Sequence, residues 1–145
     1  MRFDNKINSC WWALRIGLGS AAFLAGLDKY FNLLANWSMY VSPLAGRVAP
    51  IGAETLMHLI GPIEMLVGLA ILTRWTRIGA YVLAVWLVGI AINLVTTGMF
   101  FDLAVRDVEM AIAAYVLASL TEVRASAEVT GQHSANVSPR TIVAA

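Results

Sequence analysis

Residues 53–72, AETLMHLIGPIEMLVGLAIL, and residues 77–97, RIGAYVLAVWLVGIAINLVTT, are two long apolar runs separated only by the short segment TRWT. Each run is near the roughly 20 residues that an α-helix needs to cross about 30 Å of hydrocarbon. Neither run alternates in the manner of a strand, and in lipid a helix pairs all of its own backbone groups. This stretch therefore predicts a helical hairpin inside a membrane.

Two further apolar segments, residues 11–34 and 103–120, flank this hairpin. The chain has 145 residues, of which 59% are hydrophobic and 13% are charged, whereas a soluble domain usually carries about 25% charge. Arg15 interrupts the first segment, so we expect it to be a retained span rather than a cleaved signal peptide. The sequence predicts an all-α protein, an integral membrane four-helix bundle.

Lysine and arginine residues near the span ends predict the orientation. Six of them lie at the two termini and in the connection 73–76 with its flank, and three lie in the other two loops. Both termini are therefore expected to be cytoplasmic. We expect a cytoplasmic N-terminus at 1–10, a four-helix domain at 11–123 and a mobile cytoplasmic tail at 124–145. The loop 35–52 is expected to be ordered and partly helical.

Composition excludes several functions. The net charge of +1 gives no electrostatic reason to bind nucleic acid. Cys10 is the single cysteine, so an internal disulfide and a CxxC redox pair are both impossible. The sequence has no His/Cys cluster for zinc, haem or an iron–sulfur centre. We therefore expect no bound metal and no redox centre that belongs to the chain itself.

Small and polar residues share one face of each predicted helix. Helices in lipid associate through close packing, which favours small residues at the contact, so we expect these faces to point inward. They are Arg15, Gly19, Ala22, Gly26 and Lys29 on the first helix; Glu54, Gly61 and Gly68 on the second, flanked by His58 and Glu64; Gly79, Val82, Trp86, Gly89 and Asn93 on the third; and Asp107, Ala111, Ala114 and Ala118 on the fourth. The small residues also leave homo-oligomerisation open.

Charged groups inside a span cost roughly 2.5–3.5 kcal/mol each on insertion scales, so each needs a partner or water. Glu64, near the middle of the second helix, is the clearest case, and Arg15 and Lys29 are its two candidate partners. Eight residues form the predicted buried polar layer: Arg15, Asp28, Lys29, His58, Glu64, Asn93, Arg106 and Asp107. Two interpretations remain open, a salt-bridge layer that fixes the bundle and a site that binds a quinone head group, a small anion or a proton.

The pattern resembles the DoxX family of small bacterial four-helix membrane proteins. The segments that carry the resemblance are RIGLG at 15–19, AGLDKYFN at 25–32, Trp37 and Tyr40, GPIE at 61–64, Gly68, WL at 86–87, INL at 92–94 and VRD at 105–107. It covers about residues 11–120. The family takes its name from a subunit type linked to terminal quinol oxidation and thiosulfate:quinone oxidoreduction.

The resemblance implies a multi-pass protein of the bacterial cytoplasmic (inner) membrane. The first functional hypothesis is a subunit of a membrane oxidoreductase complex that works with quinone and with redox partner proteins, and whose electrons come from outside the chain. The second hypothesis is a non-catalytic assembly factor, scaffold or small-solute carrier. No catalytic residue is assigned, and quinone is the one cofactor that the resemblance suggests.

Overall fold

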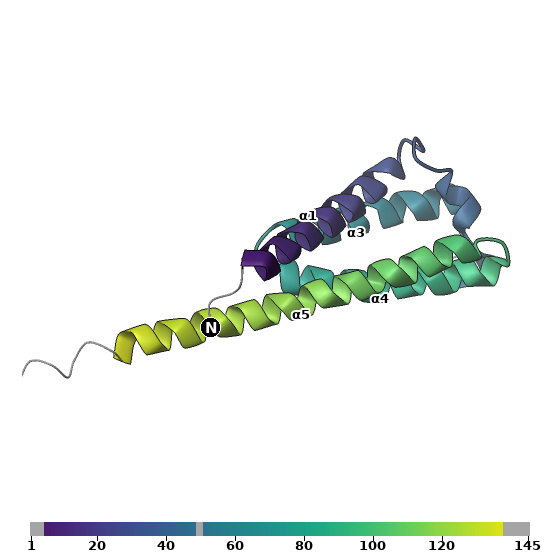
Figure 1. Ribbon diagram of the computed structural model, residues 1–145. Helices are drawn as coiled ribbons and strands as arrows, with labels where there is room; N and C mark the ends of the chain where they lie inside the picture. The colour runs from purple at the N-terminus through teal and green to yellow at the C-terminus, as the bar shows by residue number, and fades with distance from the viewer. Residues whose placement is uncertain (1–4, 49–50, 138–145) are drawn as a thin grey trace, which may run out of the picture.

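The computed structural model describes residues 5–48 and 51–137, which form helices and turns and contain no strand. The elements are α1 (Asn5–Asp28), the short 3-10 helix η1 (Trp37–Tyr40), α2 (Pro43–Val48), α3 (Ala53–Leu72), α4 (Thr76–Thr97) and α5 (Phe101–Val137) (Figure 1). Helices α1, α3 and α4 are long and apolar enough to cross a membrane. The all-α prediction is confirmed, and three membrane-length helices indicate a membrane protein.

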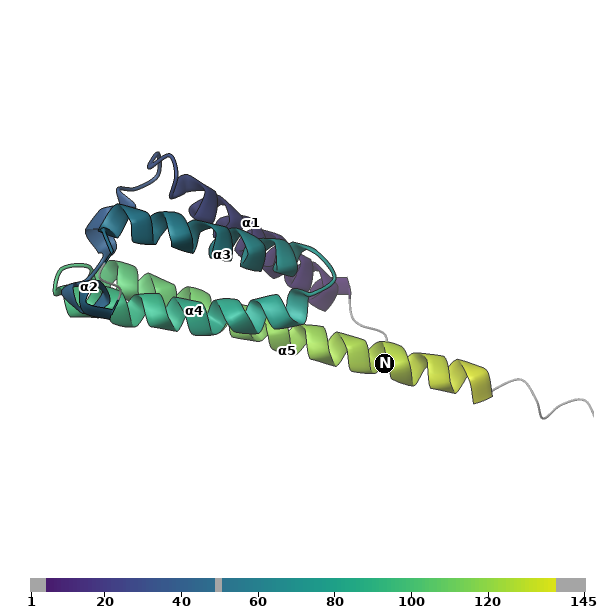
Figure 2. The ribbon, with the colours of Figure 1, turned by 180° about the vertical axis from the view of Figure 1, so that it is seen from behind.

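The four long helices are arranged as two pairs. Helix α1 packs along α3 and helix α4 packs along α5, while smaller contacts between α3 and α4 and between α1 and α5 join the pairs (Figures 1 and 2). The segment η1 contacts both α3 and α4, and α2 contacts α4. The expectation of an ordered, partly helical loop between the first two long helices is therefore confirmed.

Glycines bring α1 and α3 into backbone contact, as predicted. A Cβ atom added to Gly26 would lie 2.5 Å from the carbonyl oxygen of Gly61, and one added to Gly68 would lie 2.6 Å from the carbonyl oxygen of Gly19. Such close approach is the packing that helices use where hydrophobic burial gives no driving force. At Gly26, Gly61 and Gly68 the nearest atom is backbone of the other helix, so a larger residue there would move a helix, whereas at Gly19 the nearest atoms belong to the Leu72 side chain.

Alanines and leucines form the contact between α4 and α5. The predicted face of α5, Asp107, Ala111, Ala114 and Ala118, is buried in full. The predicted face of α4 is wrong in part, because Val82 and Gly89 are exposed. The buried stripe of α4 runs instead through Ala80, Leu83, Leu87, Ala91 and Leu94. A purely apolar helix has no polar face to fix its rotation, and small residues alone predicted a stripe turned by about one residue.

Three predicted boundaries differ from the structure by more than two residues. Helix α1 begins at Asn5 rather than near residue 11. Helix α1 ends at Asp28 rather than near residue 34, although the chain stays apolar beyond it. The carboxylate of Asp28 accepts the backbone N–H groups of Leu33 at 2.9 Å and Leu34 at 3.0 Å, and Asn32 adopts the left-handed φ of 51°. These contacts turn the chain away from the helix axis.

Helix α5 continues to Val137, so the predicted start of the tail at residue 124 does not mark the end of the helix. The expected tail at 138–145 and the first four residues lie outside the described residues. Polar composition indicated a tail, but serine, threonine and glutamine do not prevent a helix from continuing. At about 1.5 Å per residue, this helix is roughly 55 Å long.

Both described ends of the chain lie at the same end of the bundle. Arg124 of α5 donates to the Asn8 side chain of α1 at 2.7 Å, and the indole of Trp11 donates to the hydroxyl of Thr121 at 2.8 Å. Helix α5 then projects past the other helices (Figure 1). The N-terminal part of α1 and the C-terminal part of α5 are therefore joined at one end of the bundle.

Candidate functional site

A buried ion pair lies between α1 and α3. Lys29 follows the last residue of α1, and its ammonium nitrogen lies 2.5 Å from Oε2 of Glu64. Lys29 is 4% exposed and Glu64 is 6% exposed. Because side chains of a helix lean toward its N-terminus, a lysine at the C-terminal end of α1 reaches back into the bundle. Of the two candidate partners, Lys29 and not Arg15 pairs with Glu64 in the structure.

Arg15, the other candidate partner, binds backbone carbonyl groups at the C-terminal end of α3. Its guanidinium donates to the carbonyl oxygens of Ile71 at 3.0 Å and Leu72 at 2.8 Å, and also to that of Thr73. The last carbonyl groups of a helix have no partner within the helix, so Arg15 satisfies the C-terminus of α3. Its predicted place in the polar layer around Glu64 is therefore wrong, because its contacts lie at the C-terminal end of α3, seven to nine residues beyond Glu64.

Two tryptophans complete the surroundings of the ion pair. The indole nitrogen of Trp86, on α4, donates to Oε1 of Glu64 at 3.2 Å. The ring of Trp37, on η1, lies with its centroid 3.9 Å from Nζ of Lys29, a cation–π contact. Neither residue was among the predicted site residues. Trp86 carried a usable signal, since an indole N–H in the middle of a span needs an acceptor.

Asp28 holds this end of the site together. Besides the N–H groups of Leu33 and Leu34, its carboxylate accepts the indole N–H of Trp37 at 2.8 Å. The same tryptophan therefore bridges Asp28 and Lys29, which are neighbours in sequence. Asp28 orients the aromatic ring that covers the Lys29 ammonium group, and its own carboxylate is satisfied by three donors.

Asp107 brings the second helix pair into the site. It is 7% exposed on α5 and lies within electrostatic range of Lys29 and Glu64, although it forms no hydrogen bond or ion pair with either in the described structure. Its nearest cation is the neighbouring Arg106, at 3.9 Å, whose side chain is 61% exposed. We call Lys29, Glu64 and Asp107, with the indoles of Trp37 and Trp86, the buried charge cluster. It combines one ammonium group with two carboxylates.

Of the other predicted residues, His58 and Asn93 make their contacts elsewhere, and Arg106 touches the cluster only through its 3.9 Å contact with Asp107. The ring of His58 stacks on Tyr30 with centroids 5.1 Å apart. Asn93 donates to the carbonyl of Tyr40 at 2.7 Å and accepts the N–H of Ser42 at 3.2 Å, so it anchors the loop between η1 and α2. Arg106 points outward, and Glu54 is exposed on α3. The sequence placed these residues at one level of the bundle, but it did not distinguish their directions.

Pro62 explains one further contact near the site. A proline inside a helix has no N–H group to donate to the carbonyl four residues earlier, which here belongs to His58. The hydroxyl of Tyr30 donates to that carbonyl at 2.9 Å. In lipid an unpaired carbonyl costs several kcal/mol, so Tyr30 compensates for the proline and ties the start of the turn after α1 to α3.

The cluster can act as both donor and acceptor. The Lys29 ammonium and the Trp86 indole are donors, and the carboxylates of Glu64 and Asp107 are acceptors. Among the described residues, no three His, Cys, Asp or Glu side chains are grouped so that they could hold a metal ion. An ammonium donor beside carboxylate acceptors suits a polar organic group or a proton.

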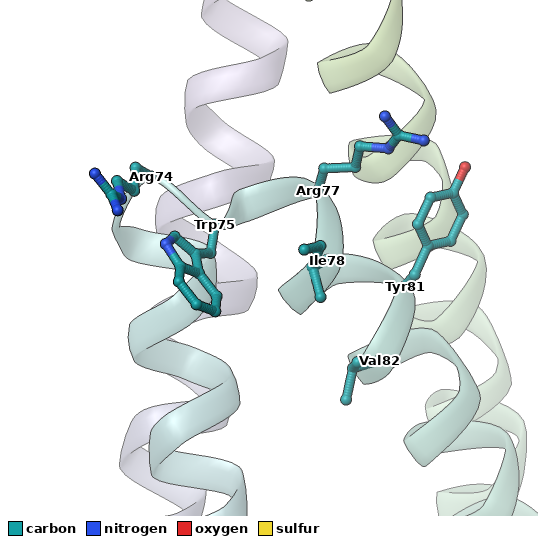
Figure 3. Close-up of a pocket in the computed structure, with 6 residues that line it drawn as sticks. All are labelled: Arg74, Trp75, Arg77, Ile78, Tyr81 and Val82. Carbon is teal, nitrogen blue, oxygen red and sulfur yellow. The ribbon is translucent and has the colours of Figure 1, made fainter.

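A separate surface hollow lies at the turn between α3 and α4, at the other end of the bundle. It is lined by Arg74, Trp75, Arg77, Ile78, Tyr81 and Val82 (Figure 3). The two guanidinium groups point away from each other, and that of Arg77 pairs with Glu122 at 2.9 Å. Its charged groups do not converge on one point, so the buried charge cluster is the stronger candidate site.

Comparison of the chain with protein-family models, with curated proteins and with solved structures finds no match.

Proposed function

We propose that this chain is a four-span membrane protein with both termini in the cytoplasm, and that it is the quinone-binding subunit of an oxidoreductase complex in the bacterial inner membrane. The observation that carries the proposal is the buried charge cluster, which lies among apolar helices. The resemblance to the DoxX family points to the same class of function. Electrons reach the quinone from a partner protein.

The donors and acceptors of the cluster suit both redox states of a quinone. The carbonyl oxygens of the oxidised ring accept hydrogen bonds, which the Lys29 ammonium and the Trp86 indole can donate. The hydroxyl groups of the reduced ring also donate, and the carboxylates of Glu64 and Asp107 can accept. Trp37 offers an aromatic face. The apolar tail of such a molecule would remain in lipid beside the exposed hydrophobic side chains of α3 and α4.

Energetics favour a functional purpose for the ion pair. Burying two charges costs more than their attraction often returns, and apolar residues of similar volume commonly stabilise a protein equally well or better. Ionisable residues inside membrane segments are costly and are functional candidates by default. The pair of Lys29 and Glu64 is therefore poorly explained by stability alone.

Binding of a short-chain ubiquinone to the protein in lipid nanodiscs tests the proposal. We expect the Glu64→Gln variant to bind this quinone at least about tenfold more weakly, since a hydrogen bond to a charged group is worth roughly 1.5–3 kcal/mol. Glu54→Gln, an exposed change on the same helix, is the matched control and should bind as the wild type does. If the wild-type protein neither retains quinone on purification nor binds the added molecule, the proposal is wrong.

A non-catalytic scaffold is the second candidate, and one observation favours it. The exposed residues of α5 include Asp102, Arg106 and Glu109, which would face lipid if the bundle stood alone. If Glu64→Gln only destabilises the protein, and quinone-dependent activity of the assembled complex is unchanged, the cluster is structural and the scaffold is the better description.

A further inference from the structure

Two opposite charges lie on the outward face of α5. The side chain of Arg106 is 61% exposed and Glu109 is also exposed. They are three residues apart, so they share one face of the helix. The same stripe continues at spacings of four and three residues through Ala113 and Val116, of which Val116 is exposed. This is the spacing of a seam between two helices.

The level of Glu109 follows from the contacts between α4 and α5. Ala104 lies in a hydrophobic cluster with Ala91, and the ring of Tyr115 contacts that of Tyr81. Glu109 lies midway between Ala104 and Tyr115 in sequence, and so level with about residue 86 of α4. That residue is close to the midpoint of a helix that is long and apolar enough to cross a membrane. Glu109 is therefore at mid-bundle height.

An isolated carboxylate at this height is expensive. Within the described part of the chain Glu109 makes no hydrogen bond or ion pair, and Arg106 has only the 3.9 Å contact to Asp107. Acidic and basic residues inside membrane segments almost always face a protein interior, a water-filled cavity or a partner. The outward direction of Glu109 excludes the interior of this chain, so a countercharge from a partner chain would offset much of its cost.

We propose that this stripe is the interface of a homodimer, in which a second copy of the chain packs its α5 against the first about a twofold axis parallel to the helices. Under such an axis each residue lies level with its own copy, and Arg106 of each copy can reach across the axis to Glu109 of the other, three residues further along. The two residues differ by about 4.5 Å in height, which two long side chains span. Ala113 is partly buried against the core of its own chain, and its small side chain leaves room for a second helix to approach the stripe.

The charge pattern is the reason for choosing a second copy over an unrelated partner helix. One arginine and one glutamate on the same stripe are self-complementary, so the interface needs no charge that this chain lacks. The inference rests on the proposed membrane placement of α5, because the same two residues in water would need no partner. It does not depend on quinone binding.

Cysteine crosslinking of the full chain in lipid nanodiscs, in a Cys10→Ser background, tests the dimer. We expect the Val116→Cys variant to form a disulfide-linked dimer under mild oxidation. Val85→Cys, an exposed position of α4 away from the stripe, is the matched control and should remain monomeric. In the Val116→Cys background, Arg106→Glu or Glu109→Arg alone should lower the rate of crosslinking roughly tenfold or more, because each places like charges together. The double exchange should restore it.

Each outcome has a separate meaning. The dimer is overturned if the Val116→Cys variant with both native charges gives no crosslink, or if exchanging both charges does not restore crosslinking. Crosslinking to a different protein in native membranes would assign the stripe to that partner instead. Labelling of the Glu109→Cys variant by a membrane-impermeant maleimide would show that α5 does not lie in the bilayer. That result would remove the basis of the inference together with the proposed four-span arrangement, whereas a protected but monomeric protein would refute the dimer alone.

Discussion

The buried ion pair of Lys29 and Glu64 predicts how single and double substitutions change the free energy of unfolding. Replacing Lys29 by Met leaves a carboxylate buried without its cation, and breaking a buried pair from one side commonly costs about 3–5 kcal/mol. Replacing Glu64 by Leu leaves the ammonium group in the same situation. We expect each single variant to lose about this much unfolding free energy in lipid or mild detergent, and the double variant to lose much less than the sum.

Equilibrium unfolding of the four proteins of this cycle measures the coupling. Glu54→Leu combined with Lys29→Met provides the control, because Glu54 is exposed and makes no contact with the pair in the described structure. If the double variant loses as much unfolding free energy as the two single variants together, the ion pair contributes no coupling energy and the prediction is wrong.

The identity of the site residues was predictable in part. A glutamate in the middle of a span demanded a partner, and the direction of helical side chains favoured Lys29, but the length of an arginine side chain kept Arg15 open. The sequence could not show that the carbonyl groups at the end of α3 would occupy Arg15. Nor could it show that Trp37 and Trp86 would converge on the pair, since they lie on a loop and on another helix.

At the scale of the helices, the contact between α1 and α3 makes a sharp prediction. Gly26→Ala adds a methyl group 2.5 Å from the carbonyl oxygen of Gly61 and 2.9 Å from the N atom of Met65. Both neighbours are backbone atoms, so the helices must separate. We expect a loss of about 1–3 kcal/mol of unfolding free energy, the usual cost of overpacking.

Gly17→Ala is the matched control on the same helix, since a Cβ atom there meets nothing within 4 Å. It should leave stability unchanged or raise it by up to about 1 kcal/mol, because alanine is the better helix former. Thermal unfolding in detergent compares the two variants. Equal stability of both would mean that α1 and α3 are not in backbone contact at Gly26.

The limits of the helices were predictable where composition changes sharply. Helix α3 has the predicted bounds because Gly52 precedes it and the polar turn 73–76 follows it. Helix α1 ends earlier than predicted because the side chain of Asp28 captures backbone N–H groups, which hydropathy does not register. Helix α5 ends later than predicted, because the loss of apolar residues removes its membrane signal without removing its helical propensity.

Across the whole molecule, the buried charge cluster connects two pairs of helices, each of which is packed through glycines or alanines. Close packing makes two pairs of helices, α1 with α3 and α4 with α5, and the contact between the pairs is smaller. The cluster draws Lys29 and Glu64 from the first pair and Trp86 and Asp107 from the second. A ligand that competes for these groups would therefore act on the contact between the pairs.

The arrangement of the four long helices predicts how the chain crosses the membrane. If α5 is the fourth span, an even number of crossings places both ends on the same side, which the basic residues predict to be the cytoplasm.

In spheroplasts, a membrane-impermeant maleimide should reach the exposed native Cys10 only after permeabilisation. In a Cys10→Ser background, a cysteine at Val129, on the projecting part of α5, should behave in the same way, whereas one at Asn36, in the loop after α1, should react at once. Reaction of the cysteines at 10 and 129 from opposite sides would show that α5 does not cross, and reaction of both at once would reverse the orientation while keeping four spans.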